Sequence, residues 1–119
     1  MKPIQTSVAS QSLAAAALLH ELVVGAARKV EDNIELLAVM IHSSIAISQV
    51  VTVSHVGVEG ANYTFVLDTT TLSGATNYVF RPSGVAPVFK RGDTIRVACA
   101  NATSPAATVY SKIQYRECA

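Results

Sequence analysis

The chain has 119 residues, of which 50% are hydrophobic and 14% are charged, and its formal net charge is +1. This is the length of one domain, and it is sufficient for a buried core that needs neither disulfides nor a structural metal. The scattered Lys and Arg residues argue against a surface that follows nucleic-acid phosphates, and the low charge indicates that another subunit covers part of the surface.

The N-terminal segment begins with a polar stretch, residues 5–12, and continues with an apolar run of seven residues, 13–19. His20 ends this run, which is therefore too short to span a membrane. The run also starts farther from Lys2 than the apolar part of a signal peptide normally does. We therefore expect neither a signal peptide nor a membrane-spanning segment here.

Two structures compete for the residues that follow the polar stretch. Alanine and leucine favour a helix over residues 11–20, with Ser12 as its N-cap. The apolar residues before Gly25 favour instead a strand over residues 17–24. We predict an N-terminal arm or short helix over residues 1–16 and lean to the strand for residues 17–24.

From about residue 30 onward the sequence is typical of short strands separated by turns, because Val, Ile, Thr and Tyr dominate and Gly recurs between them. In the clearest strand, Ile95, Val97 and Cys99 alternate with more polar neighbours and are expected to face the core. The predicted strands cover residues 34–42, 50–55, 63–67, 77–81, 94–100 and 108–116, with a short edge piece over 85–89.

This pattern predicts an all-β fold, an antiparallel and jelly-roll-like β-sandwich of about seven or eight strands over residues 17–119. The absence of crossover helices excludes a parallel α/β sheet. Residues 43–48 are expected to connect two strands. Alternation places Tyr63, Phe65 and Leu67 on one face, and we expect most aromatic side chains to face the core.

The sequence offers no convincing catalytic or metal-binding set. His20, His42 and His55 each lack a second His or Cys at a spacing suited to zinc. The acidic side chains before the first clear strand fit a solvated turn better than a paired-acid site; they are Glu31, Asp32 and Glu35. We therefore expect no enzymatic activity, no cofactor and no bound metal.

The two cysteines are expected to be unpaired thiols. If the last two strands form a hairpin, Cys99 lies near its tip and Cys118 at its far end, too far away for a disulfide. The tripeptide Arg91-Gly92-Asp93 is one that animal integrins recognise, but Gly and Asp at these positions are also typical of a tight turn. We interpret it as a turn.

Four stretches carry a resemblance to a known kind of protein: the apolar strand that runs into His42, and residues 72–82, 91–101 and 107–115. Together they resemble small β-sandwich structural proteins of tailed-bacteriophage virions. Some of those are decoration or cement proteins that clamp neighbouring capsomers, and others belong to necks and tails. The resemblance covers about residues 30–117 and implies a virion location and no catalytic residues.

The resemblance implies a capsid decoration or cement subunit that stabilises the head by multivalent contacts. Its expected partners are its own copies, in a homotrimer that matches capsid three-fold positions, and the major capsid protein or another virion protein. Neither nucleic acid nor a membrane is an expected partner. The predicted interface residues are Ile4, Val8, Leu13, Leu18, Leu19, Tyr110, Lys112 and Gln114.

A carbohydrate- or receptor-binding module is the alternative function. Such a module needs an exposed aromatic side chain beside a few polar groups. Tyr110 is the clearest outward aromatic in the sequence pattern, and the loops 69–76 and 101–106 are rich in Thr, Ser and Asn.

Overall fold

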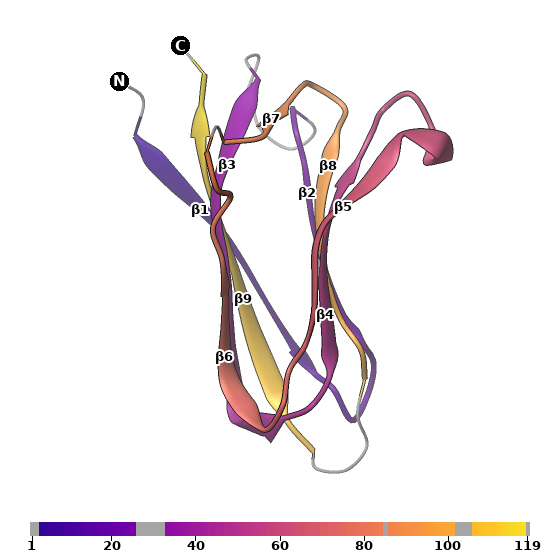
Figure 1. The fold of residues 1–119 in the computed structure, drawn as a ribbon, viewed down its shortest axis with the longest axis vertical. Coiled ribbons are helices and arrows are strands. Elements are labelled where there is room, and N and C mark those ends of the chain that lie inside the picture. The colour runs from indigo at the N-terminus through magenta and orange to yellow at the C-terminus, as the bar shows by residue number, and fades with distance from the viewer. Residues whose placement is uncertain (1–2, 26–32, 85, 102–105, 119) are drawn as a thin grey trace.

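The structure is a computed structural model that describes residues 3–25, 33–84, 86–101 and 106–118. Two antiparallel sheets face each other and enclose the core (Figure 1). Sheet A contains, in spatial order, β1 (Ile4–Ser12), β9 (Thr108–Glu117), β3 (Ile34–Ile47) and β6 (Ala75–Phe80), and the short β7 (Val88–Phe89) also pairs with β3. Sheet B contains β2 (Leu18–Val23), β8 (Thr94–Cys99), β4 (Val50–Val56) and β5 (Thr64–Thr71).

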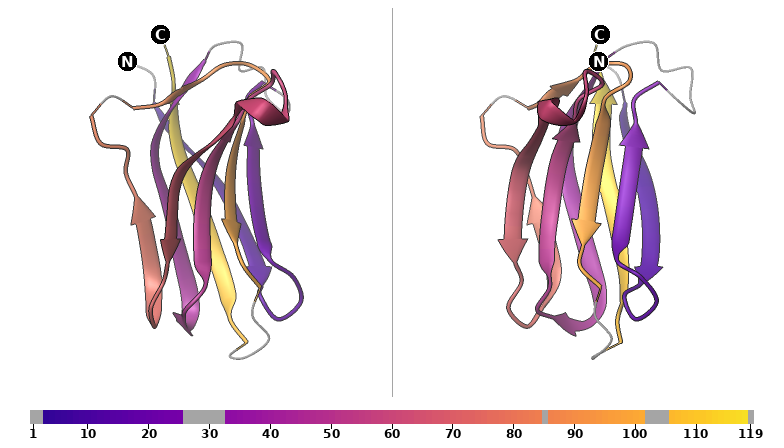
Figure 2. Two further views of the ribbon diagram at one scale, coloured as in Figure 1. Left: turned by 45° about the vertical axis from the view of Figure 1, so that its right-hand side comes forward. Right: turned by 90° about the vertical axis from the view of Figure 1, so that its right-hand side faces the viewer.

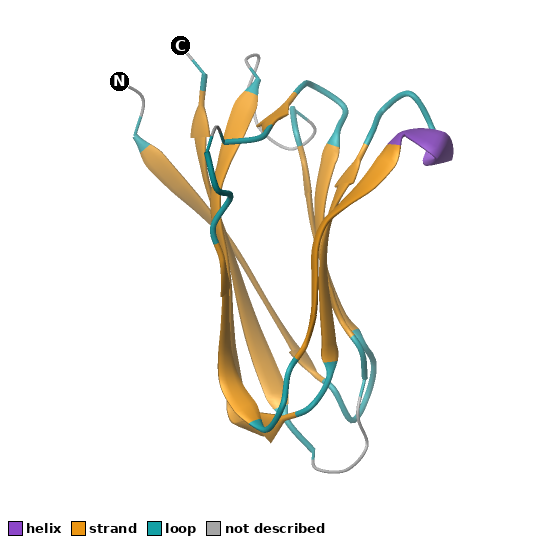
Figure 3. Ribbon diagram, viewed as in Figure 1, coloured by secondary structure: helices purple, strands orange, loops and turns teal. Residues whose placement is uncertain are grey.

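This strand order is that of a jelly roll, so the predicted all-β antiparallel sandwich is confirmed. The strands run along the long axis of a molecule that measures 43 × 30 × 27 Å (Figure 2). In the described residues the helical structure is limited to the 3-10 turn η1 (Ala61–Tyr63), which immediately precedes β5 (Figure 3). No helix in this part of the chain is long and apolar enough to cross a membrane.

The alternation expected from the sequence builds the core. Ile95, Val97 and Cys99 of β8 are buried, as predicted. On the opposite sheet the inward side chains of β9 include Val109, Ile113 and Tyr115. Ser111, on the same face of β9, is also buried. Apolar side chains from both sheets thus fill the space between them.

The last two long strands do not form a hairpin, because β8 lies in sheet B and β9 in sheet A. The expectation that no disulfide joins Cys99 and Cys118 is nevertheless confirmed. Burial raises the pKa of the Cys99 thiol, as expected for a core side chain.

At the N-terminus, the favoured strand is present as β2, and the competing helix over residues 11–20 is not formed. The amides of Ala15 and Ala16 donate to the Ser12 carbonyl and form a turn instead. Residues Ile4–Ser12 of the expected arm form the edge strand β1. β1 lies in sheet A because β9 offers it a complete row of backbone partners, which a sequence pattern does not reveal.

Two further expectations fail, one on residues 43–48 and one on the aromatic side chains before and in β5. Residues 43–47 belong to β3, in which Ser43 pairs with Val109 and Ile47 pairs with Ala75. A register shift between β4 and β5 after Val53 disturbs the expected alternation. Tyr63, in η1, and Phe65, near the start of β5, are exposed rather than in the core.

The Arg91-Gly92-Asp93 segment is a turn, as predicted. Gly92 has φ 93°, and a Cβ on it would lie 2.6 Å from Cγ2 of Val58, so only glycine fits. Asp93 is buried, and its carboxylate therefore faces the protein rather than solvent. The predictions on Glu31 and Asp32 and on most of the loop 101–106 concern residues outside the described ranges.

Candidate functional site

Strand β1 is attached to the sandwich mainly through its backbone. All nine of its residues are in register with β9, from Ile4 opposite Arg116 to Ser12 opposite Thr108. None of its side chains is buried, and its inward positions carry polar or small residues; these are Gln5, Ser7, Ala9 and Gln11. β1 therefore completes sheet A without contributing a side chain to the apolar core.

The side chains that tie β1 to its neighbours are polar. Ser7 Oγ lies 2.9 Å from His20 Nε2, and His20 Nδ1 lies 2.9 Å from Ser111 Oγ. The Tyr115 hydroxyl donates to Gln5 Oε1 over 3.1 Å. His20, on β2 of sheet B, thus bonds to β1 through Ser7 and to β9 through Ser111. A β1 strand from another copy could form the same bond to His20.

The buried imidazole of His20 is kept neutral by its surroundings. Its side chain is among the buried polar groups, and this burial lowers its pKa below the usual value. A neutral imidazole can donate from one ring nitrogen and accept at the other, which suits two hydroxyl partners. The unfolded chain therefore binds a proton more readily than the folded protein does.

We expect stability to fall as the pH drops below about 6.5, the ordinary value for histidine. The neutral state favours folding above this pH, and the effect is lost as the pH falls toward the lowered folded-state pKa of His20. Urea denaturation at about pH 7.5 and about pH 5 measures it. In the His20→Gln variant the drop in unfolding free energy should be smaller, and an equal drop would contradict the role of His20.

The link after β1 is anchored in the core at both ends. Leu13 and Leu18 are buried, and the Leu13 amide donates to the Ala107 carbonyl over 2.8 Å. The four alanines between them are exposed. Leu13 and Leu18, which were predicted as interface residues, are thus part of the core of this chain.

The outer face of sheet A brings together the other predicted interface residues. Val8 is opposite Lys112 on β9, which is opposite Met40 on β3. Val8 is 68% exposed and Tyr110 is 51% exposed. Ile4 and Gln114 lie on the same outer face. Leu19 is also exposed, but it belongs to β2 and lies on sheet B.

Tyr110 and Lys112 form the wall between two shallow hollows on this face. One hollow, of about 360 Å³, extends to Val8 on β1. The other, of about 370 Å³, extends across β3 to Val79 on β6, which is exposed, and includes His42. His42 and Val79 were not predicted, because their position depends on the strand order β9-β3-β6 and not on their own spacing.

No described group of three or more His, Cys, Asp and Glu side chains is arranged to hold a metal ion. The three histidines lie apart: His20 is between the sheets, His42 is on the outer face of sheet A beside Asn77, and His55 contacts Asp93. Each of the three histidines thus forms hydrogen bonds within the protein.

Comparison with known proteins gives limited similarity. No protein-family model matches the sequence, and no curated protein is significantly similar to it. A structure from work on Bacillus endospore appendages, described as a family of disulfide-linked pili, has 14% identity and a TM-score of 0.48, covering 100% of this chain and 92% of the other. A chain from the infectious bursal disease virus Gx strain has 9% identity and a TM-score of 0.28, covering 98% of this chain and 38% of the other.

Proposed function

We propose that this protein is a non-catalytic structural subunit that assembles with copies of itself, and that β1 is the element exchanged between copies. The observation that carries the proposal is the nine-residue pairing of β1 with β9 without any buried side chain. A second copy can supply the same strand to the same edge, so exchange retains every backbone contact. The apolar core stays intact because β1 takes no part in it.

Exposed apolar side chains on the outer faces of both sheets support the proposal that neighbouring copies cover this subunit in its assembly. Exposed Val8, Val79 and Tyr110 lie on sheet A, and exposed Leu19 lies on sheet B. With only 14% charged residues in the chain, little charge opposes the burial of these faces. We propose the outer face of sheet A as the main contact surface because it is continuous with β1.

The assembly we propose is the surface of a virion, with this chain as a capsid decoration or cement subunit. The sequence resemblance in the strands after residue 30 supports this assignment, as does the low charge of the chain. A homotrimer bound to the major capsid protein would stabilise the head through many modest contacts. Electron microscopy of virions labelled with an antibody to this protein tests it: label on the capsid lattice is expected, and label confined to the tail or neck would overturn it.

A lysine at position 8 is expected to weaken self-association by tenfold or more. Val8→Lys places a second positive charge opposite Lys112 on the contact face, and like charges in an interface oppose burial. The sandwich should still fold, because Val8 is the most exposed of the large hydrophobic side chains described and one exposed like-charge pair costs only about 1 kcal/mol or less. Sedimentation velocity across a concentration series measures the dissociation constant.

Leu19→Lys is the matched control, because Leu19 is 59% exposed on the outer face of the other sheet. It adds the same charge to the chain without changing sheet A. An equal loss of association in both variants would mean that net charge, rather than the face of sheet A, controls assembly.

A further inference from the structure

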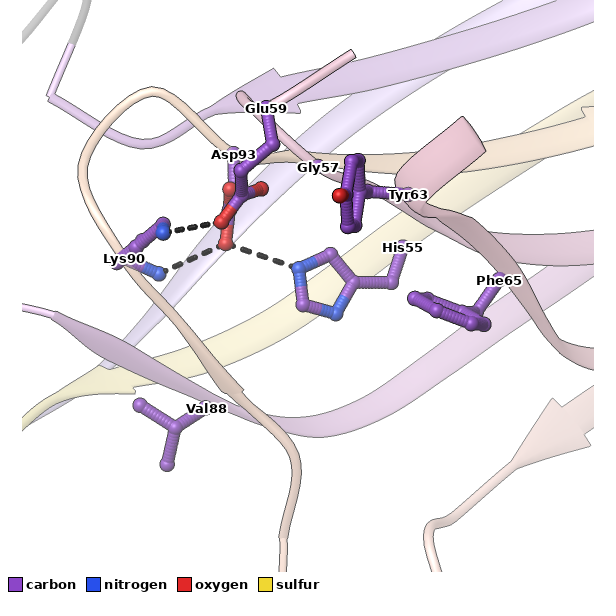
Figure 4. A pocket seen from close by; sticks show the side chains of 8 residues that line it. All are labelled: His55, Gly57, Glu59, Tyr63, Phe65, Val88, Lys90 and Asp93. Atoms are coloured by element: carbon purple, nitrogen blue, oxygen red, sulfur yellow. Dashed lines mark hydrogen bonds and ion pairs between the residues drawn. The ribbon is translucent and has the colours of Figure 1, made fainter. Parts of the chain in front are cut away.

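A cavity separate from the assembly surface lies at the end of the sandwich that carries η1 and β7 (Figures 1 and 4). Its volume is about 280 Å³, close to the lower limit of about 300 Å³ for typical ligand pockets. Four elements contribute to its wall: the end of β4, the segment from η1 into β5, the short β7 and the turn before β8. Its lining residues are His55, Gly57, Glu59, Tyr63, Phe65, Val88, Lys90 and Asp93.

The charged side chains of this cavity are held by hydrogen bonds and one ion pair. The buried Asp93 carboxylate accepts hydrogen bonds from the Val58 amide (2.9 Å), the Lys90 amide (3.1 Å) and His55 Nε2 (2.9 Å). The Lys90 ammonium forms an ion pair with Glu59. The network extends across the cavity from Lys90 through Asp93 to His55 (Figure 4). Hydrogen bonds thus satisfy the Asp93 carboxylate, and Glu59 neutralises the Lys90 ammonium.

The contact with Asp93 fixes the orientation of the His55 ring. Because Nε2 donates to the carboxylate, Nδ1 of a neutral ring is left as an acceptor. The ring also packs on Phe89, with centroids 4.0 Å apart, which holds its plane. Among the described groups none is hydrogen-bonded to Nδ1, and the side chain is 23% exposed. The cavity thus contains a fixed acceptor that a hydroxyl group can reach.

Aromatic side chains flank this acceptor. Tyr63 is 54% exposed and Phe65 is 60% exposed. In Figure 4 both rings lie on the side of His55 opposite Lys90, while Val88 lies below. The hydrogen bonds of Asp93 have a structural role, since they hold the neighbouring turns. That role does not account for the two exposed aromatic rings beside them. Exposed rings next to an oriented acceptor form a surface for a ligand that is apolar on one face and bears hydroxyl groups at its edge.

We propose that this cavity binds a neutral sugar residue. The C–H face of a pyranose ring would pack on Phe65 or Tyr63, and one hydroxyl would donate to His55 Nδ1. The Lys90–Glu59 pair at the rim offers both a donor and an acceptor to further hydroxyl groups. An anionic ligand is disfavoured because Glu59 already neutralises Lys90. The proposal is independent of β1 and of the outer face of sheet A.

Saturation-transfer-difference NMR on the full chain tests the proposal, since it observes the ligand and is compatible with an oligomer of any size. The probes are glucose, galactose, mannose and N-acetylglucosamine, with adenosine as a stacking compound of another class. We expect at least one sugar to bind with millimolar affinity, with the strongest saturation on its ring C–H protons. Phe65→Ala or Tyr63→Ala should weaken that binding by roughly fivefold or more.

Tyr110→Ala is the matched control, because Tyr110 is similarly exposed but lies on the outer face of sheet A. It should leave sugar binding unchanged. Circular dichroism checks that each variant is folded. Absence of binding for all four sugars overturns the proposal, as does binding of adenosine alone or binding that is lost in Tyr110→Ala but retained in Phe65→Ala and Tyr63→Ala.

Discussion

Replacing Asp93 with alanine is expected to lower the free energy of unfolding by about 3 kcal/mol. The change removes the acceptor of three hydrogen bonds and leaves the Val58 and Lys90 amides without their partner. Burial pushes the pKa of Asp93 upward, but the hydrogen bonds from Val58, His55 and Lys90 outweigh it and hold the pKa below its usual value. The folded state therefore favours the ionised carboxylate.

Urea denaturation followed by circular dichroism measures this effect. Glu59→Ala is the control, because it removes the exposed partner of Lys90 from the same region and should change stability little. For wild type, the stabilisation by Asp93 is present at neutral pH and is lost as the pH falls below about 3.8, toward its lowered folded-state pKa. An Asp93→Ala variant as stable as Glu59→Ala would show that water replaces the carboxylate at no cost.

The fold class could be predicted wherever one face of a strand is apolar. β8 and β9 met this condition, with Ile95, Val97 and Ile113 at alternating positions. β1 did not, because its inward positions hold polar and small side chains such as Gln5 and Ser7. Its structure depends on backbone pairing with a strand about a hundred residues away, and no local pattern encodes such pairing.

In the candidate sites, too, single residues could be predicted from the sequence but their arrangement in space could not. Val8, Tyr110 and Lys112 were each predicted from their own surroundings, but only the pairing of β1 with β9 makes them neighbours. Most aromatic side chains were expected in the core, but Tyr63 and Phe65 are exposed where η1 leads into β5. The wall of the cavity combines residues from several elements, so it could be found only in three dimensions.

Deletion of residues 2–12 is expected to abolish self-association while the remaining sandwich stays folded. The deletion removes all of β1 but no member of the apolar core, so unfolding free energy should decrease by only about 2–4 kcal/mol. A synthetic peptide of residues 1–12 should bind the truncated protein, because β9 then has a free edge of matching register. Calorimetry measures the binding, and circular dichroism measures the fold.

A peptide with proline at both positions 8 and 9 is the control for this binding. Ladder hydrogen bonds alternate along an antiparallel strand, so one of two adjacent prolines must remove a bond to β9. The control peptide should bind at least tenfold more weakly. Equal binding of both peptides, or a truncated protein that still self-associates like the full chain, would contradict the role of β1.

In strand exchange, the β1 that pairs with a given β9 comes from another copy, whereas in simple association it comes from the same chain. Thr6 and Gln114 are opposite each other on the outer face of sheet A, so cysteines at these positions are close enough for a disulfide. Copies with Thr6→Cys are mixed with copies with Gln114→Cys, both carrying Cys118→Ser to remove a competing thiol. Reciprocal exchange predicts a covalent heterodimer under mild oxidation. If β1 stays on its own chain, the two cysteines never face each other, and the mixture should contain no such heterodimer.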